Sequence, residues 1–451
     1  MRPALFAALA ALAAPVLGAP IDPAALRDAA RADTLARDIA EGLTTEIGPR
    51  LAGTEAEARA RDWAVARLKA LGFSNVRIEP FDMPVWVRGE ETAEVVGPNP
   101  QKLALTALGN SGATPAGGIT ADVVGFDGLE ALQAADPASV RGRIVFVNHH
   151  MTATQDGSGY GYFGNVRRAG PSIASAKGAA AIVIRSIGTD THRVPHTGVQ
   201  NWANGAKPIP AAALSVPDAE QMARLLARGP VKLHLTLTPR QTGVHRSGNV
   251  IAEVPGRDPN AGVIVVGGHL DSWDLGTGAI DDAAGVAIAT AAAKRVMDAG
   301  RPLHSIRLVW FGAEEVGIFG GRAYAAAHGR EPHYLAAESD FGADRIWKVT
   351  SRVAPSGLPV VDRLAPLLAP LGITKGRNDA NAGSDIEPLG RLGVPVIEFA
   401  QDGTRYFDLH HTADDTLDKI DPEQLRQNVA AWTAMLALTA EEATPLGPVG
   451  D

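Results

Sequence analysis

The run GVIVVGGH, residues 262–269, constrains the fold more than any other feature of the sequence. A short apolar run without alternation is typical of a parallel β-strand that is buried on both faces. The stretch 281–300 follows with helical character, and SIRLVWFGAEE, HYLAAESD and GVPVIEFAQ are further strand candidates. Strands that alternate with helices indicate an α/β fold. We therefore predict a mostly parallel mixed sheet that is sandwiched by helices.

The sequence pattern changes ahead of this region, which indicates a second domain in the chain of 451 residues. Short β runs such as GRIVFVNHH and VKLHLTLTP are separated there by Gly and Pro. We predict an inserted β-rich domain at 109–241, between an N-terminal part at 20–108 and the main domain at 242–451. The pair His149-His150 lies in this block. Its spacing demands no metal, and contact with substrate is one option for it.

The first residues have the pattern of an export signal. The segment 1–19, MRPALFAALAALAAPVLGA, has a positive start at Arg2, an apolar run, and a small-residue end at Gly18 and Ala19. A buried Ala-rich helix is the alternative. No later stretch is long and apolar enough to anchor the chain in a membrane. We predict a signal peptide and an exported protein, periplasmic or secreted.

Composition narrows the partners and the chemistry. The formal net charge is -8 and no basic block occurs, which argues against nucleic acid as a partner. The chain has no cysteine, so any metal must be held by His, Asp or Glu side chains.

Acidic groups and one histidine gather in GGHLDSWDLGTGAIDDAAG, residues 267–285, among mostly small residues. His269 and Asp271 follow the predicted strand two residues apart, so they can point the same way. Functional residues in such sheets collect past the carboxyl ends of strands. His269 can then ligate a metal while Asp271 supports its ring. Asp281 lies in the Gly- and Ala-rich turn, where one carboxylate can bridge two cations.

Three later segments carry the same kinds of side chain. Glu314 and Glu315 end one strand candidate. As neighbours in an extended chain they face opposite ways, so one can ligate a metal while the other accepts a proton. Asp340 ends the next strand candidate, and His411 lies in DLHHTADDT before the last predicted helix. Buried carboxylates need a partner or a metal.

These residues together predict five nitrogen and oxygen ligands for two metal ions. Three protein ligands on each metal leave an open position, which marks a catalytic site. Such a pair lowers the pKa of a bridging water and polarises a carbonyl, with Glu314 as the general base. In this prediction Asp281 is shared, His269 and Asp340 complete one metal site, and Glu315 and His411 complete the other.

The ordered motifs GGHLDSWD, GAIDDAAG, FGAEEVG, AESDFG and HHTADDT resemble a known family. It is the co-catalytic zinc peptidase family of carboxypeptidase Q (plasma glutamate carboxypeptidase) and secreted bacterial aminopeptidases. NAGSDIEPLGRLGVP, residues 381–395, resembles the same branch, and the likeness covers essentially the whole chain. The block 109–241 resembles the protease-associated domain that this branch inserts ahead of the metal motifs.

The resemblance implies a zinc peptidase fold with two Zn²⁺ per chain, although nitrogen and oxygen ligands accept other divalent metals. It implies that Asp281 bridges the metals, with a cis peptide bond to Asp282. Asp271 and Glu314 would be the catalytic acidic pair. The last ligand would be His411 rather than His410, because the family's ligand directly precedes a Ser or Thr.

The function that this resemblance implies is hydrolysis of dipeptides or short peptides. An aminopeptidase or dipeptidase is our preferred interpretation. A carboxypeptidase is the alternative, and it needs a cation for the terminal carboxylate. A non-catalytic binding protein on the same scaffold would be expected to lack a ligand or the base, and none is missing. The oligomeric state stays open, with a homodimer as one option. For the carboxypeptidase alternative, the candidate cations that could hold the terminal carboxylate are Arg352, Arg377, Arg391 and Arg405.

Two other enzyme classes fit less well. An aminoacylase-type amidohydrolase uses a similar ligand order but inserts its extra domain between the later metal ligands, whereas the predicted insertion here precedes His269. A single-zinc glutaminyl cyclase is disfavoured because the first metal site retains its histidine.

Overall fold

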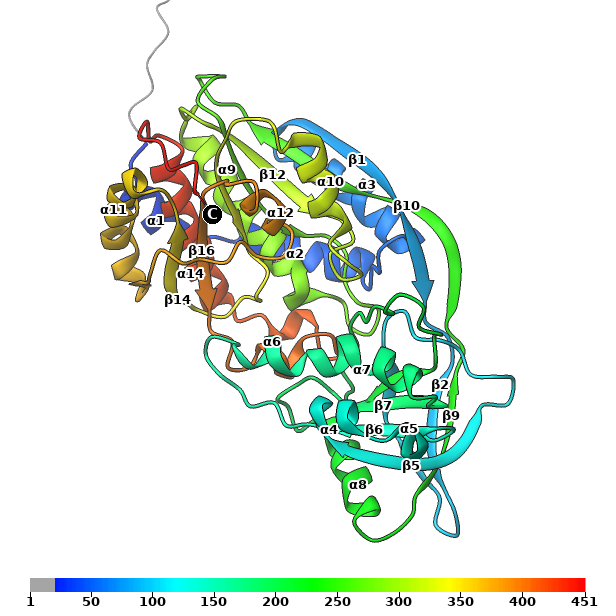
Figure 1. Ribbon diagram of the computed structural model, residues 1–451. Helices are drawn as coiled ribbons and strands as arrows, with labels where there is room; N and C mark the ends of the chain where they lie inside the picture. Colours follow the sequence, from blue (N-terminus) through cyan, green and yellow to red (C-terminus); the bar gives the residue numbers. More distant parts are fainter. Residues whose placement is uncertain (1–20, 451) are drawn as a thin grey trace, which may run out of the picture.

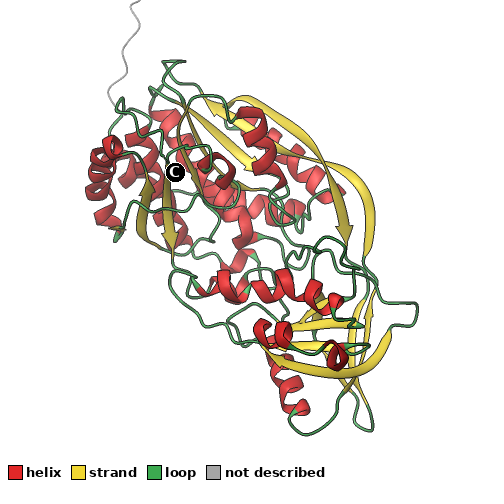
Figure 2. Cartoon of the chain, in the orientation of Figure 1, coloured by secondary structure: helices red, strands yellow, loops and turns green. Residues whose placement is uncertain are grey.

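The computed structural model describes residues 21–450, which form two lobes that are each built around an eight-stranded sheet (Figures 1 and 2). The large lobe contains residues 21–90 and 238–450, and the small lobe contains residues 91–237. The predicted signal peptide at 1–19 lies outside the described residues.

The sheet of the large lobe has four parallel strands at its centre, as the sequence predicts. Strands β12, β11, β13 and β16 run parallel to one another. The pairs β1–β10, β10–β12 and β14–β16 are antiparallel, and β15 runs parallel to β14. In order across the sheet the strands are β1 (Ser74–Val87), β10 (Arg240–Val254), β12 (Ser305–Phe311), β11 (Val263–His269), β13 (His333–Glu338), β16 (Val396–Gln401), β14 (Ile346–Arg352) and β15 (Thr374–Lys375).

Helices cover both faces of this sheet, because alternate strand residues point to opposite sides. Ile264 and Val266 of β11 pack in one core with α9 and α14, whereas Val265 packs on the other face with α10 and α12. The helices of the large lobe are α1 (Pro23–Ala30), α2 (Leu35–Gly42), α3 (Glu55–Ala70), α9 (Ala284–Ala299), α10 (Phe319–His328), α11 (Leu358–Leu368), α12 (Glu387–Gly390), α13 (Tyr406–Leu409) and α14 (Pro422–Thr439).

The small lobe contains a second mixed sheet with helices on both sides (Figure 2). Its helices are α4 (Leu129–Ala134), α5 (Pro137–Val140), α6 (Gly159–Phe163), α7 (Asn165–Ala176) and α8 (Val216–Leu226). In order its strands are β3 (Gln101–Leu103), β2 (Glu91–Val96), β9 (Lys232–Leu237), β5 (Ile119–Asp127), β6 (Ile144–Asn148), β7 (Ala181–Arg185), β8 (Ala211–Leu214) and β4 (Leu105–Ala107).

The second sheet begins earlier in the chain than residue 109, where we predicted the inserted block to start. Strand β2 pairs with β9 from Glu91 opposite Leu237 onward, and β4 pairs with β8. These partners lie more than a hundred residues apart in the chain, so local patterns could not reveal the pairing. The division of the chain into domains stays a prediction.

The first part of the described chain forms three helices, α1, α2 and α3. The last helix, α14, is capped by Asp421, whose carboxylate accepts the N–H groups of Glu423 and Gln424 at 2.8 and 3.0 Å. Among residues 21–450, the structure contains no helix that is long and apolar enough to cross a membrane.

Candidate metal centre

The five predicted ligands come together at the ends of the central strands. His269 is the last residue of β11, and Glu315 and Asp340 follow β12 and β13. Asp281 precedes α9, and His411 follows α13. The parallel register places the ends of β11 and β12 side by side, with His269 opposite Phe311. The carboxyl ends of the parallel strands therefore gather the side chains, as expected for this kind of sheet.

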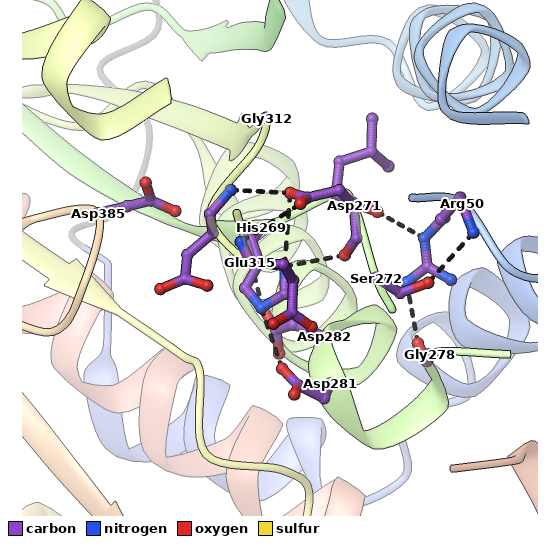
Figure 3. Close-up of polar contacts among 12 residues, drawn as sticks. Arg50, His269, Asp271, Ser272, Gly278, Asp281, Asp282, Gly312, Glu315 and Asp385 are labelled. Atoms are coloured by element: carbon purple, nitrogen blue, oxygen red, sulfur yellow. Dashed lines mark hydrogen bonds and ion pairs between the residues drawn. The ribbon is translucent and has the colours of Figure 1, made fainter. Parts of the chain in front are cut away.

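Asp281 lies between two histidine rings. Its Oδ1 is 3.0 Å from His269 Nε2, and its Oδ2 is 3.3 Å from His411 Nε2 (Figure 3 shows the first contact). Asp340 Oδ1 is 3.3 Å from His269 Nε2, and Glu315 Oε2 is 2.9 Å from His411 Nε2. One carboxylate is thus shared by two sets, each with a further histidine and a further acid. The peptide bond between Asp281 and Asp282 is cis, as the resemblance implies.

The neighbouring His410 is placed differently. Its Nε2 is 3.6 Å from Asp281 Oδ2, which is farther than His411. Its ring packs against the rings of Tyr160 and Phe407, at 5.1 and 5.4 Å between ring centroids. Its backbone carbonyl accepts a hydrogen bond from His196 Nδ1 at 2.8 Å. These contacts give His410 a packing role and favour His411 as the ligand.

The donor set fits divalent metal ions. Glu315 Oε1 is buried and has no hydrogen-bond partner among the described residues, and a buried carboxylate oxygen without a partner is costly. Imidazole nitrogens and carboxylate oxygens are the ligands that zinc and similar ions bind. Three groups of residues bring their ligand atoms within 4.8 Å of one another: Asp281 with His410 and His411, His269 with Asp281 and Glu315, and His269 with Asp282 and Asp340.

The carboxylate of Asp282 already holds the backbone. It accepts the N–H of His269 at 3.0 Å and that of Gly285 at 2.9 Å. It thereby ties the end of β11 to the first turn of α9, which favours a structural role over a ligand role.

Asp271 connects the ligand-bearing segments. Its backbone carbonyl accepts a hydrogen bond from His269 Nδ1 at 2.9 Å, so His269 Nε2 is left to face Asp281. Its carboxylate accepts the N–H groups of Glu314 and Glu315 at 3.0 and 3.3 Å. Figure 3 shows Asp271 between His269 and Arg50. Asp271 therefore orients the first histidine and the two glutamates at once.

Glu314 lies beside the cluster with a perturbed acidity. Burial, and next the negative charge of Asp340, raise the pKa of the Glu314 carboxyl to about 7. Burial raises the pKa of Asp271 to about 6, and the charge of Glu314 contributes to this shift. A carboxyl group with a pKa near neutrality can both accept and donate a proton in a reaction.

Sequence patterns did not reveal Arg50, which holds the loop between His269 and Asp281. Its guanidinium is fully buried. It donates to the carbonyl oxygen of Leu270, to that of Thr277 at 2.7 Å and to that of Gly278 at 2.9 Å. Arg50 precedes this loop by more than two hundred residues, so no local signal could have found it.

Replacement of Arg50 by methionine should destabilise the protein. Three buried carbonyl groups would lose their donors, and each loss costs about 1–3 kcal/mol. We expect the free energy of unfolding in urea to fall by about 3 kcal/mol or more. The control is Arg391→Met, where a solvent-exposed i,i+4 pair with Glu387 should contribute only about 0.3–0.5 kcal/mol. Equal effects of the two substitutions would refute this role of Arg50.

The small lobe also contributes to the cluster. The carbonyl oxygen of Thr197 lies 3.3 Å from His411 Nδ1 and can accept a hydrogen bond from the Nδ1–H group. This leaves His411 Nε2 facing Glu315. Arg167 Nη1 lies 3.4 Å from the same nitrogen, and Arg167 Nη2 donates to the Tyr160 hydroxyl at 2.6 Å. The contacts of Thr197 and Arg167 with His411 join segments more than two hundred residues apart, so local sequence patterns could not reveal them.

Asp415 holds the backbone beside the shared carboxylate. Its carboxylate accepts the N–H groups of Ile280 and Asp281 at 2.6 and 3.2 Å. Trp273 is buried, and its ring lies 5.8 Å from that of His411. Asp415 thus positions the shared carboxylate, and Trp273 packs beside a candidate ligand.

Comparison with known proteins agrees with this arrangement. Residues 249–437 match the sequence model of Peptidase family M28. Carboxypeptidase Q of Bos taurus is 34% identical over 412 residues, which cover 88% of this chain and 84% of that protein. The crystal structure of a peptidase M28 precursor from Shewanella amazonensis SB2B is 46% identical, covers 95% of this chain and 98% of its own, and has a TM-score of 0.93.

A more distant structure shares the fold. The zinc aminopeptidase BSAP from Bacillus subtilis is 19% identical with a TM-score of 0.67, over 91% of this chain and 97% of that one. The α/β fold and the buried cluster of histidines and acids are those of a hydrolytic metalloenzyme. The chain belongs to peptidase family M28 and is a metallopeptidase.

Proposed function

We propose that the protein is an exported exopeptidase that holds two zinc ions and removes residues from the amino end of dipeptides or short peptides. The observation that carries the proposal is the position of Asp281, whose two carboxylate oxygens each approach a different histidine ring. Asp340 and His269 would complete one metal site, and Glu315 and His411 would complete the other. Three protein ligands on each ion leave a position open, which is typical of catalytic sites.

Zinc is the proposed metal because the donors are imidazole and carboxylate, and because the related enzyme from Bacillus subtilis is described as a zinc aminopeptidase. Other divalent ions would also bind such donors.

The zinc ions, when bound, would supply a Lewis acid that lowers the pKa of water and polarises the peptide carbonyl. Glu314 would accept the proton from the attacking water and later donate it to the leaving amine. Asp271 is a positioning residue in this proposal, because its contacts fix the His269 ring and the backbone of Glu314.

The cavity beside the cluster favours the amino end of a substrate. Its volume is about 240 Å³, and the carboxylates of Asp156, Glu338, Asp340 and Glu398 lie in its wall. Within the described part of the chain, no lysine or arginine lines it. Asp340 would serve a metal ion and burial raises the pKa of Glu338, so Asp156 and Glu398 are the wall acids left to attract the positively charged α-amino group of a substrate.

The carboxypeptidase alternative lacks a cation at this cavity. Arg405 pairs with Asp344, while Arg377 and Arg391 are exposed and pair with acids near them in the chain. A carboxypeptidase would need a guanidinium or ammonium group directed at the terminal carboxylate. None of the four arginines that we considered lines the cavity beside Asp340: Arg352, Arg377, Arg391 and Arg405.

Export is part of the proposal and rests on the pattern of residues 1–19, with its positive start, apolar run and small-residue end. Fractionation of the native host, with the mass of the mature chain measured, tests it. A mature chain that begins near residue 20 in the periplasm or the medium supports export, and an uncut chain in the cytoplasm contradicts it.

The proposal that the enzyme attacks the amino end of its substrate is tested with purified enzyme whose metal content has been measured. We expect about two zinc ions per chain, fast hydrolysis of free dipeptides and aminoacyl-anilides, and little hydrolysis of N-acetyl dipeptides, because the acetyl group removes the positive charge that the acidic wall would bind. Preferential cleavage of the N-acetyl dipeptides would establish the carboxypeptidase alternative. A zinc-loaded enzyme that cleaves none of these compounds would overturn the proposed activity.

A further inference from the structure

The small lobe has a cavity of its own at the carboxyl ends of the parallel strands β5 and β6. Its volume is about 450 Å³, within the range of small-molecule sites. Residues from α4, α6 and the start of α7 contribute to its wall, and Figure 1 shows α4 beside β6. Ligands of open α/β sheets bind at the carboxyl ends of the strands, so this position suits a ligand.

His149 lies in the wall of this cavity with its polar atoms unused. The residue follows β6 directly and is only 5% exposed. Neither Nδ1 nor Nε2 has a hydrogen-bond partner in the described chain. Leaving buried polar atoms unpaired costs about 1–3 kcal/mol for each group, so a ligand in the cavity that pairs with a ring nitrogen would offset part of this cost.

The ring of His149 is neutral. Burial, and next the positive charge of Arg185, lower its pKa to about 3. A neutral imidazole has one donor nitrogen and one acceptor nitrogen. An amide group offers both a carbonyl oxygen and an N–H, so it can pair with one ring nitrogen, whether that nitrogen is the donor or the acceptor.

The rest of the wall suits a flat apolar group. Phe163 stacks on His149 with ring centroids 5.9 Å apart and an interplanar angle of 25°. Tyr162 is 61% exposed and meets Phe163 edge to face at 5.0 Å. Leu129 and Val166 add aliphatic surface. Aromatic rings favour stacked and edge-to-face neighbours of their own kind.

Charge at the cavity disfavours an anion. Asp127 and Glu130 lie in the wall, and the Tyr162 hydroxyl donates to Glu130 at 2.9 Å. No lysine or arginine of the described chain lines the cavity. A carboxylate ligand would be repelled by the two acids, whereas a neutral amide would not.

We propose that this cavity is a binding site for a small neutral aromatic amide, with the amide on His149 and the aromatic ring against Phe163 and Tyr162. The site is separate from the candidate metal centre. Helix α6 lies between the two, because its Tyr160 stacks on Phe407 at 4.7 Å on one side while Tyr162 and Phe163 face the cavity. The inference does not depend on the proposed function.

The test uses isothermal titration calorimetry with the mature enzyme and N-acetyl-L-phenylalaninamide. Neither end of this probe is free, so an exopeptidase cannot hydrolyse it. We expect saturable binding of one molecule per chain, unchanged in Glu314→Gln. The anionic analogue N-acetyl-L-phenylalanine should bind about tenfold more weakly, or less, because of Asp127 and Glu130.

His149→Phe is the decisive variant. It keeps an aromatic ring of similar size against Phe163 but has no ring nitrogen, and affinity should fall by about tenfold. Tyr162→Ala, at an exposed position, should weaken binding because it removes one of the two aromatic rings that would contact the ring of the ligand. Both variants should retain the wild-type circular dichroism spectrum and peptidase rate.

Three results would overturn the proposal. They are the absence of saturable binding to the wild-type enzyme at millimolar probe, equal binding to wild type and a folded His149→Phe, and displacement of the probe by a dipeptide that occupies the metal centre.

Discussion

Replacement of Glu314 by glutamine is expected to lower kcat by about 10²–10⁴-fold, the usual contribution of a general acid-base group. Glutamine has nearly the same shape, but it cannot accept a proton. The backbone N–H of residue 314 would still donate to Asp271, so the neighbouring ligand segment should keep its place. Zinc content and melting temperature should therefore stay close to those of the wild-type protein.

The matched control for this prediction is Glu315→Gln, one residue along the chain. Glu315 Oε2 lies 2.9 Å from His411 Nε2, and we propose that it binds a metal ion. This variant should lose zinc as well as activity, whereas Glu314→Gln should lose activity alone. A Glu314→Gln enzyme with wild-type kcat would show that another group moves the proton.

Removal of the metal ions with a chelator is expected to abolish hydrolysis and to lower the melting temperature. The buried acids Asp281 and Glu315 would then lose the cations that compensate their charge. Zinc at a free concentration of about a thousand times its dissociation constant would stabilise the folded chain by about 4 kcal/mol. Added zinc should restore both properties, which can be followed by differential scanning calorimetry and peptide hydrolysis.

Adjacent histidines provide the control for the metal prediction. His411→Ala should lose about one zinc ion per chain and most of the activity. His410→Phe keeps a ring beside Tyr160 and Phe407 and should retain both ions. The reverse pattern would make His410 the ligand, and an unchanged melting temperature after complete zinc removal would contradict the stabilising role of the metals.

Local sequence patterns were sufficient to predict the central strands of the large sheet and the helices that cover its two faces. The apolar run 262–269 could be buried only between two layers of helices, and β11 occupies that place with its two faces in different cores. The strand ends also predicted where His269, Glu315 and Asp340 would gather, because parallel strands bring their carboxyl ends to one edge.

Long-range pairing was outside the reach of such patterns. Strands β2 and β4 join the second sheet through partners far along the chain, which moved the start of that sheet ahead of residue 109. Arg50 supports the loop before Asp281, and Thr197 contacts His411, through contacts that leave no periodic trace in the sequence.

The sequence by itself determined the class of chemistry. Its ordered histidines and acids, in a chain without cysteine, left nitrogen and oxygen metal chemistry at strand ends as the consistent interpretation. The tertiary structure places His411, the histidine that the resemblance favoured, beside Glu315. Only the tertiary structure decided that no arginine of the described chain lines the acidic cavity. It also decided that His149 lines a separate cavity, with neither ring nitrogen hydrogen-bonded to any residue of 21–450. The reason is physical: residue type and spacing limit what a side chain can do, but packing of distant segments sets its orientation, its neighbours and its access to a ligand.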